Sequence, residues 1–199
     1  MILFQDTAIV LAGGGSRRLG QDKRRLRLWG ADGPTLLEYT VGIVGALCAE
    51  VIVVLNDPEA WPQLPARLVP DAYPGTGPLG GIVSGLAAAQ YEYALVVACD
   101  MPELNTHALT MLLNWPRPYD ALVPQADGAQ RNRNGIEPLH AVYHRRCHAP
   151  AAALLAREER RVTALFNHVT THYVPWHTLA PEDSAMRGLR SVNTVDDLL

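Results

Sequence analysis

Short apolar runs alternate with segments of helical periodicity over the first half of the chain. The runs are rich in Val, Leu, Ile and Ala and are bounded by Gly, Pro, Asn or Asp. They predict buried strands at 8–11, 51–55, 67–71 and 94–99. Apolar residues at helical spacing predict helices at 34–47, 79–89 and 105–113. Strands that alternate with helices form a mainly parallel sheet covered by helices on both faces.

The second half alternates less regularly. Strands are predicted at 121–124, 139–143 and 172–174, helices at 148–159 and 162–168, and a final helical turn at 195–199. The polar stretch 125–136 is predicted to be a loop. No repeat, low-complexity tract or composition change marks a linker. The pattern therefore predicts one α/β domain over residues 1–199, a Rossmann-like three-layer α/β/α sandwich with a mainly parallel sheet.

Composition narrows the class of protein. Apolar residues make up 48% of the 199 residues and charged residues 19%, which is typical of a folded chain with a sizeable core. No apolar run of about 18 residues predicts a transmembrane helix, and the first residues do not resemble a signal peptide. A net charge of −3 argues against a general nucleic-acid binder. We expect a cytoplasmic protein that binds neither membrane nor nucleic acid.

Cysteine and histidine spacing does not predict a metal centre. Cys48, Cys99 and Cys147 are odd in number and form no CxxC pair, which is typical of reduced thiols and not of a zinc site. The histidines at 140, 144 and 148 recur every four residues, but this stretch crosses a predicted strand end and Pro150. We interpret them as surface or hydrogen-bonded histidines.

A glycine-rich loop follows the first predicted strand. It reads Leu11-Ala12-Gly13-Gly14-Gly15-Ser16-Arg17-Arg18-Leu19-Gly20-Gln21-Asp22-Lys23. Consecutive glycines let backbone N–H groups approach an anion, and parallel sheets bind ligands beyond the carboxyl ends of their strands. Lys23 is the only lysine among 17 basic residues, so the chain places a compact point charge at this position alone. The loop predicts phosphate binding, with a plain turn as the alternative.

Two familiar phosphate motifs do not fit this loop. A Walker loop needs lysine directly after its last glycine, where the chain has Gln21. A dinucleotide fingerprint needs a third glycine where the chain has Arg18. The sequence therefore supports neither an ordinary P-loop enzyme nor a Rossmann dehydrogenase.

A second glycine-rich segment, Asp71 to Ile82, leads into the predicted helix at 79–89. It contains Gly77, Pro78 and Leu79 at the helix start. A helix N-terminus at the sheet edge offers unpaired N–H groups to an anion. A tight connection between strand and helix is the alternative interpretation.

An aspartate follows the apolar strand at 94–99. Asp100 stands in the segment Cys99-Asp100-Met101-Pro102, and Pro102 prevents the strand from continuing in the middle of a sheet. Mg²⁺ is held by one or two carboxylates together with substrate phosphates, so one aspartate at this edge is sufficient. The alternative is a turn-initiating aspartate. Cys99 is interpreted as a buried strand residue and not as a nucleophile.

The glycine loop resembles the signature of the MobA-like nucleotidyltransferases, LAGGxSxRxGxDK, at every fixed position. The resemblance implies a nucleotide-diphospho-sugar transferase-like fold. It implies that Leu11, Ala12 and Gly13 face the nucleotide, that the backbone from Gly13 through Gly14 and Gly15 to Ser16 cradles phosphate, and that Arg18 and Lys23 contact the phosphates. Related cytidylyltransferases usually have two alanines at Gly13-Gly14, so the resemblance points to guanine.

The resemblance extends beyond this loop. It implies that Asn56 and Asp71 contact the nucleotide, that the segment Gly77-Pro78-Leu79 shapes the base and ribose pocket, and that Asp100 is the metal ligand. Residues from about 1 to 105 would form the nucleotide-binding half, and residues from about 106 to 199 the acceptor-binding half.

The acceptor half matches the family less closely. Glu137-Pro138-Leu139 is a partial match to a QPL segment, and Ser191-Val192-Asn193-Thr194 to an NxNTP segment in which Ser191 and Val195 replace the family's residues. The resemblance implies acceptor binding by Asn134, Ser191 and Asn193.

The implied activity is transfer of GMP from GTP to the phosphate of a molybdenum-molybdopterin cofactor, with release of pyrophosphate. Mg²⁺ would be the cofactor, and the partners would be GTP, the molybdopterin-type cofactor, cofactor-synthesis proteins and chaperones of recipient molybdoenzymes. The alternatives are a cytidylyl- or other nucleotidyltransferase with a different phosphate acceptor, and a non-catalytic nucleotide-binding partner module on the same fold.

Overall fold

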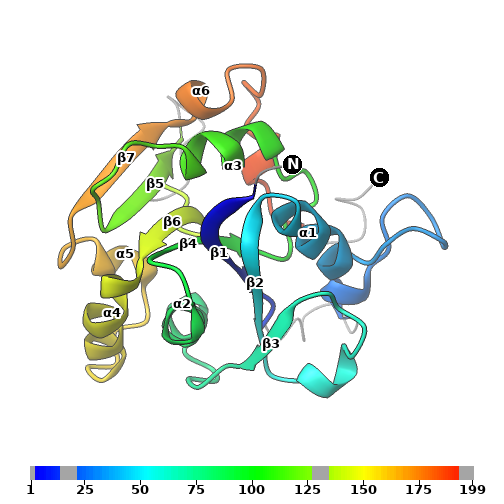
Figure 1. The fold of residues 1–199 in the computed structure, drawn as a ribbon, viewed down its shortest axis with the longest axis horizontal. Helices are drawn as coiled ribbons and strands as arrows, with labels where there is room; N and C mark the ends of the chain where they lie inside the picture. Colours follow the sequence, from blue (N-terminus) through cyan, green and yellow to red (C-terminus); the bar gives the residue numbers. More distant parts are fainter. Residues whose placement is uncertain (1–2, 14–21, 127–134, 193–199) are drawn as a thin grey trace.

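The computed structural model describes residues 3–13, 22–126 and 135–192. They contain one seven-stranded sheet in the order β3-β2-β1-β4-β6-β5-β7 (Figure 1). Its strands are β1 Phe4–Leu11, β2 Cys48–Leu55, β3 Arg67–Pro70, β4 Tyr93–Ala98, β5 Ala121–Gln125, β6 His140–His144 and β7 Thr171–Pro175. Only β6 among them runs antiparallel to its neighbours, β4 and β5. The sheet is therefore mainly parallel, as the alternation predicts.

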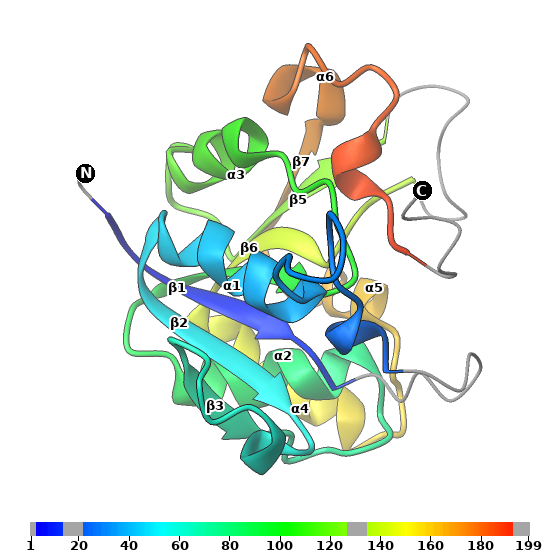
Figure 2. The same ribbon diagram turned by 90° about the vertical axis from the view of Figure 1, so that its right-hand side faces the viewer.

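Helices cover both faces of the sheet. They are α1 Leu36–Gly45, α2 Pro78–Ala88, α3 Thr106–Leu113, α4 His148–Leu155, α5 Val162–Leu165 and α6 Trp176–Leu179. Helices α1, α3 and α6 contribute to one buried apolar cluster, and α2, α4 and α5 contribute to the other. Figures 1 and 2 show these two helix layers on opposite sides of the sheet. The three-layer α/β/α sandwich is therefore confirmed.

Alternate residues of β1 supply the two cores. Ala8 and Val10 belong to the cluster beneath α1 and α3, whereas Ile9 belongs to the cluster beneath α2. A Cβ at Gly85 would lie 2.5 Å from Cγ2 of Ile9, so glycine allows α2 to approach the central strand closely. This contact holds the second half of α2 against β1.

Most predicted elements occur close to their predicted bounds, but two strands and three helices differ. The strands predicted at 8–11 and 51–55 begin earlier, at Phe4 and Cys48. The helix predicted at 34–47 begins after Thr35, which forms a capping box with Glu38, and ends at Gly45. The helices predicted at 148–159 and 162–168 end at Leu155 and Leu165. Helix α6 was not predicted, because four residues carry too little periodicity. The predicted turn at 195–199 lies outside the described residues.

None of the helices in the described ranges is both long and apolar enough to cross a membrane.

Candidate active site

Three strand ends bring Gly13, Asn56 and Asp71 together. The side-chain nitrogen Nδ2 of Asn56 donates a hydrogen bond to the carbonyl oxygen of Gly13 at 3.2 Å. A Cβ at Gly13 would lie 3.7 Å from this nitrogen and 3.8 Å from Oδ2 of Asp71. Because the strands are parallel, their carboxyl ends share one edge of the sheet. The residues predicted to contact a nucleotide on β1, β2 and β3 therefore form one cluster.

The ends of β1 and β4 are joined at the same edge. The N–H of Cys99 donates to the carbonyl oxygen of Leu11 at 3.1 Å, and the N–H of Ala12 donates to that of Val54 at 2.9 Å. These bonds extend the sheet pairing beyond the strands and place Asp100 beside the start of the glycine loop.

Lys23 and Asp100 are linked through a segment near residue 190. The ammonium Nζ of Lys23 donates to the carbonyl oxygen of Val192 at 2.7 Å. The N–H of Val192 donates to the carbonyl oxygen of Asp100 at 2.8 Å, and the hydroxyl of Ser191 donates to the Asp100 carboxylate. In Figure 2 the orange-red segment returns to the edge at which β1 and β2 end. The structure thus brings together three predicted site residues from distant parts of the chain.

Partial burial is the main influence on the pKa of the Asp100 carboxyl. Removal of water raises the pKa of this carboxyl above its usual value, while the positive charge of Lys23 and hydrogen bonds from its own backbone and Ser191 act to lower it. A poorly hydrated carboxylate beside a hydroxyl oxygen is a donor set suited to a hard cation such as Mg²⁺. The parts of the chain that the structure describes hold no group of three His, Cys, Asp or Glu residues, so phosphate oxygens would have to complete such a site.

The turn before α2 is shaped for close backbone approach. Gly77 has φ of 76°, a conformation that favours glycine, and Pro78 occupies the first helical turn. A Cβ at Gly80 would lie 2.1 Å from Oγ1 of Thr76, so glycine is needed there as well. The side chain of Leu79 is fully buried. Leu79 as a whole residue exposes no surface, so of the predicted segment only Gly77 and Pro78 are exposed to a ligand.

The Asp71 side chain is held from two sides. Its Oδ1 accepts hydrogen bonds from the N–H of Tyr73 at 2.9 Å and from the hydroxyl of Ser84 at 3.0 Å. Ser84 lies on α2, so the carboxylate at the end of β3 is fixed relative to the helix start. Such an anchored carboxylate can accept hydrogen bonds from a ribose or base without reorganisation.

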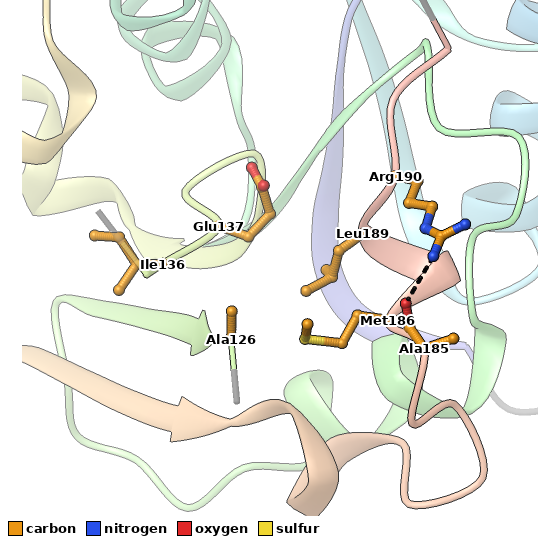
Figure 3. Close-up of a pocket in the computed structure, with 7 residues that line it drawn as sticks. All are labelled: Ala126, Ile136, Glu137, Ala185, Met186, Leu189 and Arg190. Carbon is orange, nitrogen blue, oxygen red and sulfur yellow. Dashed lines mark hydrogen bonds between the residues drawn. The ribbon is translucent and has the colours of Figure 1, made fainter. Parts of the chain in front are cut away.

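A cavity of about 320 Å³ lies near Asp100, whose charge acts on Glu137 in the cavity lining. It is lined by Ala126, Ile136, Glu137, Ala185, Met186, Leu189 and Arg190. Figure 3 shows Ala126, Ile136 and Glu137 on one side of the cavity and Ala185, Met186, Leu189 and Arg190 on the other, where Arg190 donates to the Ala185 carbonyl at 3.3 Å. The lining exposes more polar than apolar surface and includes one acidic and one basic side chain beside apolar residues, which suits an organic group that carries polar atoms.

Glu137 is the acidic residue of this cavity. Burial raises the pKa of its carboxyl to about 7, and the negative charge of Asp100 contributes in the same direction, opposed by a hydrogen bond from the N–H of Leu139. Near neutral pH this carboxyl is therefore about half protonated and can donate a hydrogen bond. It stands in the partial QPL match, where a glutamine would donate a hydrogen bond at any pH.

His140 does not have the environment that we expected. The expectation was a surface or hydrogen-bonded histidine, but the side chain is fully buried, and neither ring nitrogen has a hydrogen-bond partner within residues 3–13, 22–126 and 135–192. The ring makes an edge contact with Trp176 at 5.6 Å between centroids, and burial lowers its pKa to about 4. His140 is the first residue of β6, and the antiparallel direction of β6, which the sequence does not show, places it against Val97 in the core.

The three cysteines are buried and unpaired. Burial raises the pKa of the Cys99 thiol to about 12, and negative Asp100 and Asp22 act in the same direction. A thiol that remains protonated is a poor nucleophile, in agreement with the interpretation of Cys99 as a packing residue.

Several predicted contacts fall outside the described residues: Gly14, Gly15, Ser16, Arg18, Asn134 and Asn193. Other residues at the site were not singled out from the sequence: Arg24, Asp57, Met186 and Arg190. Arg24 follows Lys23 directly, and Asp57 follows Asn56, so adjacency was the available signal for both. Met186 and Arg190 carry no local signal, because only the return of the chain to Asp100 brings them to the site.

The chain belongs to the family described as the MobA-like NTP transferase domain, whose model matches residues 8–172. A relative named probable molybdenum cofactor guanylyltransferase, from Chloroflexus aggregans, is 46% identical over 197 residues, which cover 96% of this chain and 91% of the relative. A molybdenum cofactor guanylyltransferase from Desulfosudis oleivorans is 30% identical over 193 residues, with 96% and 92% covered.

The fold has a similar solved counterpart. The crystal structure of molybdopterin-guanine dinucleotide biosynthesis protein A from Archaeoglobus fulgidus superposes with a TM-score of 0.76, at 24% identity, over 96% of this chain and 94% of that one. The fold resemblance predicted from the glycine loop is therefore confirmed, and the family membership makes the chain a nucleotidyltransferase.

Proposed function

We propose that this protein transfers GMP from GTP to the phosphate of a molybdopterin-type cofactor, giving a guanine dinucleotide and pyrophosphate. The observation that carries the proposal is the meeting of Lys23 and Asp100 through Val192 and Ser191, between the nucleotide cluster and the cavity. The names of the relatives, which are 46% and 30% identical, supply the guanine and the acceptor.

The two substrates would bind at two different regions near Asp100. Gly13, Asn56 and Asp71, with the start of α2, would bind the nucleotide and define the nucleotide-binding half. The cavity around Glu137 and Arg190 would bind the acceptor in the half that begins near residue 106. Apolar Met186 and Leu189 would pack against a pterin ring, and Arg190 would face its anionic groups.

The reaction needs no protein nucleophile. An oxygen of the acceptor phosphate attacks the α-phosphorus in line, the new P–O bond forms, and the bond to the leaving pyrophosphate breaks. A phosphate monoester is already ionised near neutral pH, so positioning and charge stabilisation carry the catalysis. Lys23 would stabilise charge that develops on the phosphates, and the half-protonated Glu137 would donate a hydrogen bond to the acceptor.

Asp100 would hold Mg²⁺, and Ser191 would orient the Asp100 carboxylate by its hydrogen bond. When bound, the ion would neutralise charge on the phosphates of both substrates and hold them in line. Asp100 is half-buried; the Val192 N–H holds its backbone carbonyl and the Ser191 hydroxyl holds its carboxylate, so both are oriented before a ligand binds. Cofactor-synthesis proteins and chaperones of recipient molybdoenzymes would then exchange acceptor and product with the enzyme.

The test is a calorimetric titration with GTP, CTP, ATP and UTP, each with Mg²⁺, followed by an assay for pyrophosphate release with the molybdopterin acceptor. We expect GTP to bind most tightly and only GTP to release pyrophosphate. Lys23→Ala should weaken binding and slow transfer. Arg161→Ala is the matched control, because it removes an exposed positive charge that pairs with Glu159.

Each other outcome points to a different function. Preference for CTP would indicate a cytidylyltransferase. Tight GTP binding without pyrophosphate release from the molybdopterin acceptor would favour another phosphate acceptor or a non-catalytic binding module. No nucleotide binding would contradict the proposal.

A further inference from the structure

The guanidinium of Arg24 joins three segments at the edge of the nucleotide cluster. Its Nε and Nη2 donate to the two carboxylate oxygens of Asp22 at 2.8 and 2.7 Å. Its Nη1 and Nη2 donate to the two oxygens of Asp57 at 2.5 and 2.7 Å, and Nη1 also donates to the carbonyl oxygen of Ala12 at 3.3 Å. One side chain thus connects the end of β1, the end of the glycine loop and the residue after Asn56.

These contacts use the whole donor set of the side chain. A guanidinium has five N–H donors in a fixed plane, one on Nε and two on each Nη. Arg24 makes five hydrogen bonds in this distribution, to Asp22, Asp57 and Ala12. Arg24 therefore lacks a spare donor for a phosphate in this arrangement, although it lies beside a predicted phosphate-binding loop. Its role must be exerted through other residues.

The residue that Arg24 holds in place is its neighbour, Lys23. Lys23 begins a short helical turn, Lys23–Arg25, which Asp22 caps by accepting from the N–H of Arg24 at 3.0 Å. Arg24 therefore fixes both the cap of this turn and the position of the turn against β1 and β2. Its side chain is only 15% exposed, so solvent competes weakly for these bonds.

Charge supports the same role. Asp22 and Asp57 place two carboxylates beside the loop, and both pair with Arg24. Unpaired, they would repel the phosphates of a nucleotide and attract the Lys23 ammonium away from the site. The pair with Arg24 is bidentate on each carboxylate, a geometry that a lysine cannot reproduce.

We propose that Arg24 is a positioning residue for the transfer reaction, which holds Lys23 toward the phosphates by clamping Asp22 to Asp57 and to the end of β1. This inference rests on the proposed function. Beyond the proposed function, the inference assigns a role to Arg24, which acts on the transfer rate through the position of Lys23.

The test compares variants that separate charge from shape. Arg24→Lys keeps the charge and loses the planar fork, and Arg24→Gln loses both. A misplacement of about 1 Å can cost about 100-fold in rate. We expect Arg24→Lys to lower kcat by about 10- to 100-fold with a smaller change in KM for GTP, and Arg24→Gln to raise KM as well. Arg25→Lys is the matched control: Arg25 lies in the same turn, donates to the carbonyl oxygen of Ala60 and makes only a longer ion pair with Asp22, 3.8 Å, whose charge lysine keeps.

Two further readouts distinguish positioning from a merely structural role. Thermal unfolding shows whether each variant is folded at the assay temperature, and added millimolar guanidinium should partly restore activity to Arg24→Ala. In a Lys23→Ala background, Arg24→Lys should have little further effect on kcat or on GTP affinity, because the two substitutions act on one interaction.

Three results would overturn the inference: unchanged kcat in Arg24→Lys, an equal loss in Arg25→Lys, or the full effect of Arg24→Lys persisting without Lys23. A wild-type protein that binds GTP but transfers nothing would overturn the proposed transfer alone, since the Arg24–Lys23 coupling is also measured in GTP affinity.

Discussion

Two regions near Asp100 are built in different ways: the cluster of Gly13, Asn56 and Asp71, called the nucleotide side, and the cavity around Glu137 and Arg190, called the acceptor side. On the nucleotide side, a residue of the cluster follows each of β1, β2 and β3 within two positions, so three neighbouring strand ends supply Gly13, Asn56 and Asp71. On the acceptor side, Ala126, Ile136 and Glu137 line the cavity together with residues about 50 positions later in the chain, Ala185, Met186, Leu189 and Arg190. Parallel strand ends give the first side a repeated frame, whereas the second depends on one long return of the chain. We expect the first side to tolerate little change in packing and the second to respond most to pH.

The largest loss of activity should come from substitution of Asp100. Asp100→Asn removes the carboxylate charge proposed to hold Mg²⁺, and a lost electrostatic contact of this kind costs about 100- to 1,000-fold in kcat. Pyrophosphate release at varied Mg²⁺ concentration measures the loss. Asp6→Asn is the control, because Asp6 is also buried but pairs with Arg117 far from the nucleotide cluster, so it should lower stability and leave kcat unchanged. A normal Mg²⁺ dependence in Asp100→Asn would contradict the assignment.

The acceptor side should show two opposed pH effects. The folded pKa of His140 is about 4 against 6.5 for the free group, so its neutral form contributes stability that is lost as pH falls from about 6.5 to about 4. The folded pKa of Glu137 is about 7 against 4.5, so its neutral form contributes stability that is lost as pH rises from about 4.5 to about 7. Each effect amounts to about 2–3 kcal/mol over its range.

These two slopes nearly cancel in the wild-type protein. Urea unfolding between pH 4 and pH 8 should therefore show a small net contribution from this pair. Glu137→Gln should expose the His140 slope, with stability that rises with pH, and His140→Leu should expose the opposite slope. If both variants keep the wild-type pH profile, the burial of these groups does not control stability.

The nucleotide side should be sensitive to packing beneath it. Gly85→Ala places a methyl group against Ile9 on the central strand and should lower the free energy of unfolding by about 1–3 kcal/mol. Gly42→Ala is the matched helix control, since nothing lies within 4 Å of the added group, and it should stabilise the protein by up to about 1 kcal/mol. Equal effects from the two substitutions would show that α2 does not need this close approach.

The smallest loss of activity should come from substitution of Ser191. Ser191→Ala removes one hydrogen bond to the Asp100 carboxylate, worth about 1 kcal/mol at an exposed position, and should lower kcat by about fivefold. It should also raise the pKa of Asp100 and shift the acidic limb of the pH–rate profile upward. Ser191→Asn should preserve activity, because an amide can donate the same bond. A larger loss in Ser191→Asn than in Ser191→Ala would contradict this role.

The nucleotide side could be predicted from the sequence more fully than the acceptor side. Strands β1, β2 and β4 were predicted because buried parallel strands are continuous apolar runs that end in Gly, Asn or Asp. The strand ends then locate Gly13, Asn56 and Asp100 without any long-range information. The reversed direction of β6 has no such local signal, and so the burial of His140 could not be predicted.

Long-range partners explain the remaining omissions. Asp57 lies 33 positions from Arg24, so the sequence shows two charged residues but not the fork between them. The cavity walls likewise come from segments that only the folded sheet brings together. The glycine loop could thus be predicted from residues that are adjacent in the sequence. The contacts that hold this loop in place could not, because their partners are distant in the sequence.

The hydrogen bond from Lys23 to Val192 has a consequence for the time order in which the protein forms during synthesis. It spans 169 positions, and the bond from Val192 to Asp100 spans most of the second half of the chain. Contacts of such separation form late in folding, because a long loop must close before they contribute. A growing chain on the ribosome can therefore pair β1, β2, β3 and β4 while Lys23 and Asp100 remain unlinked. The two residues join only after residue 192 has left the ribosome, so a partly synthesised chain cannot carry out the reaction early.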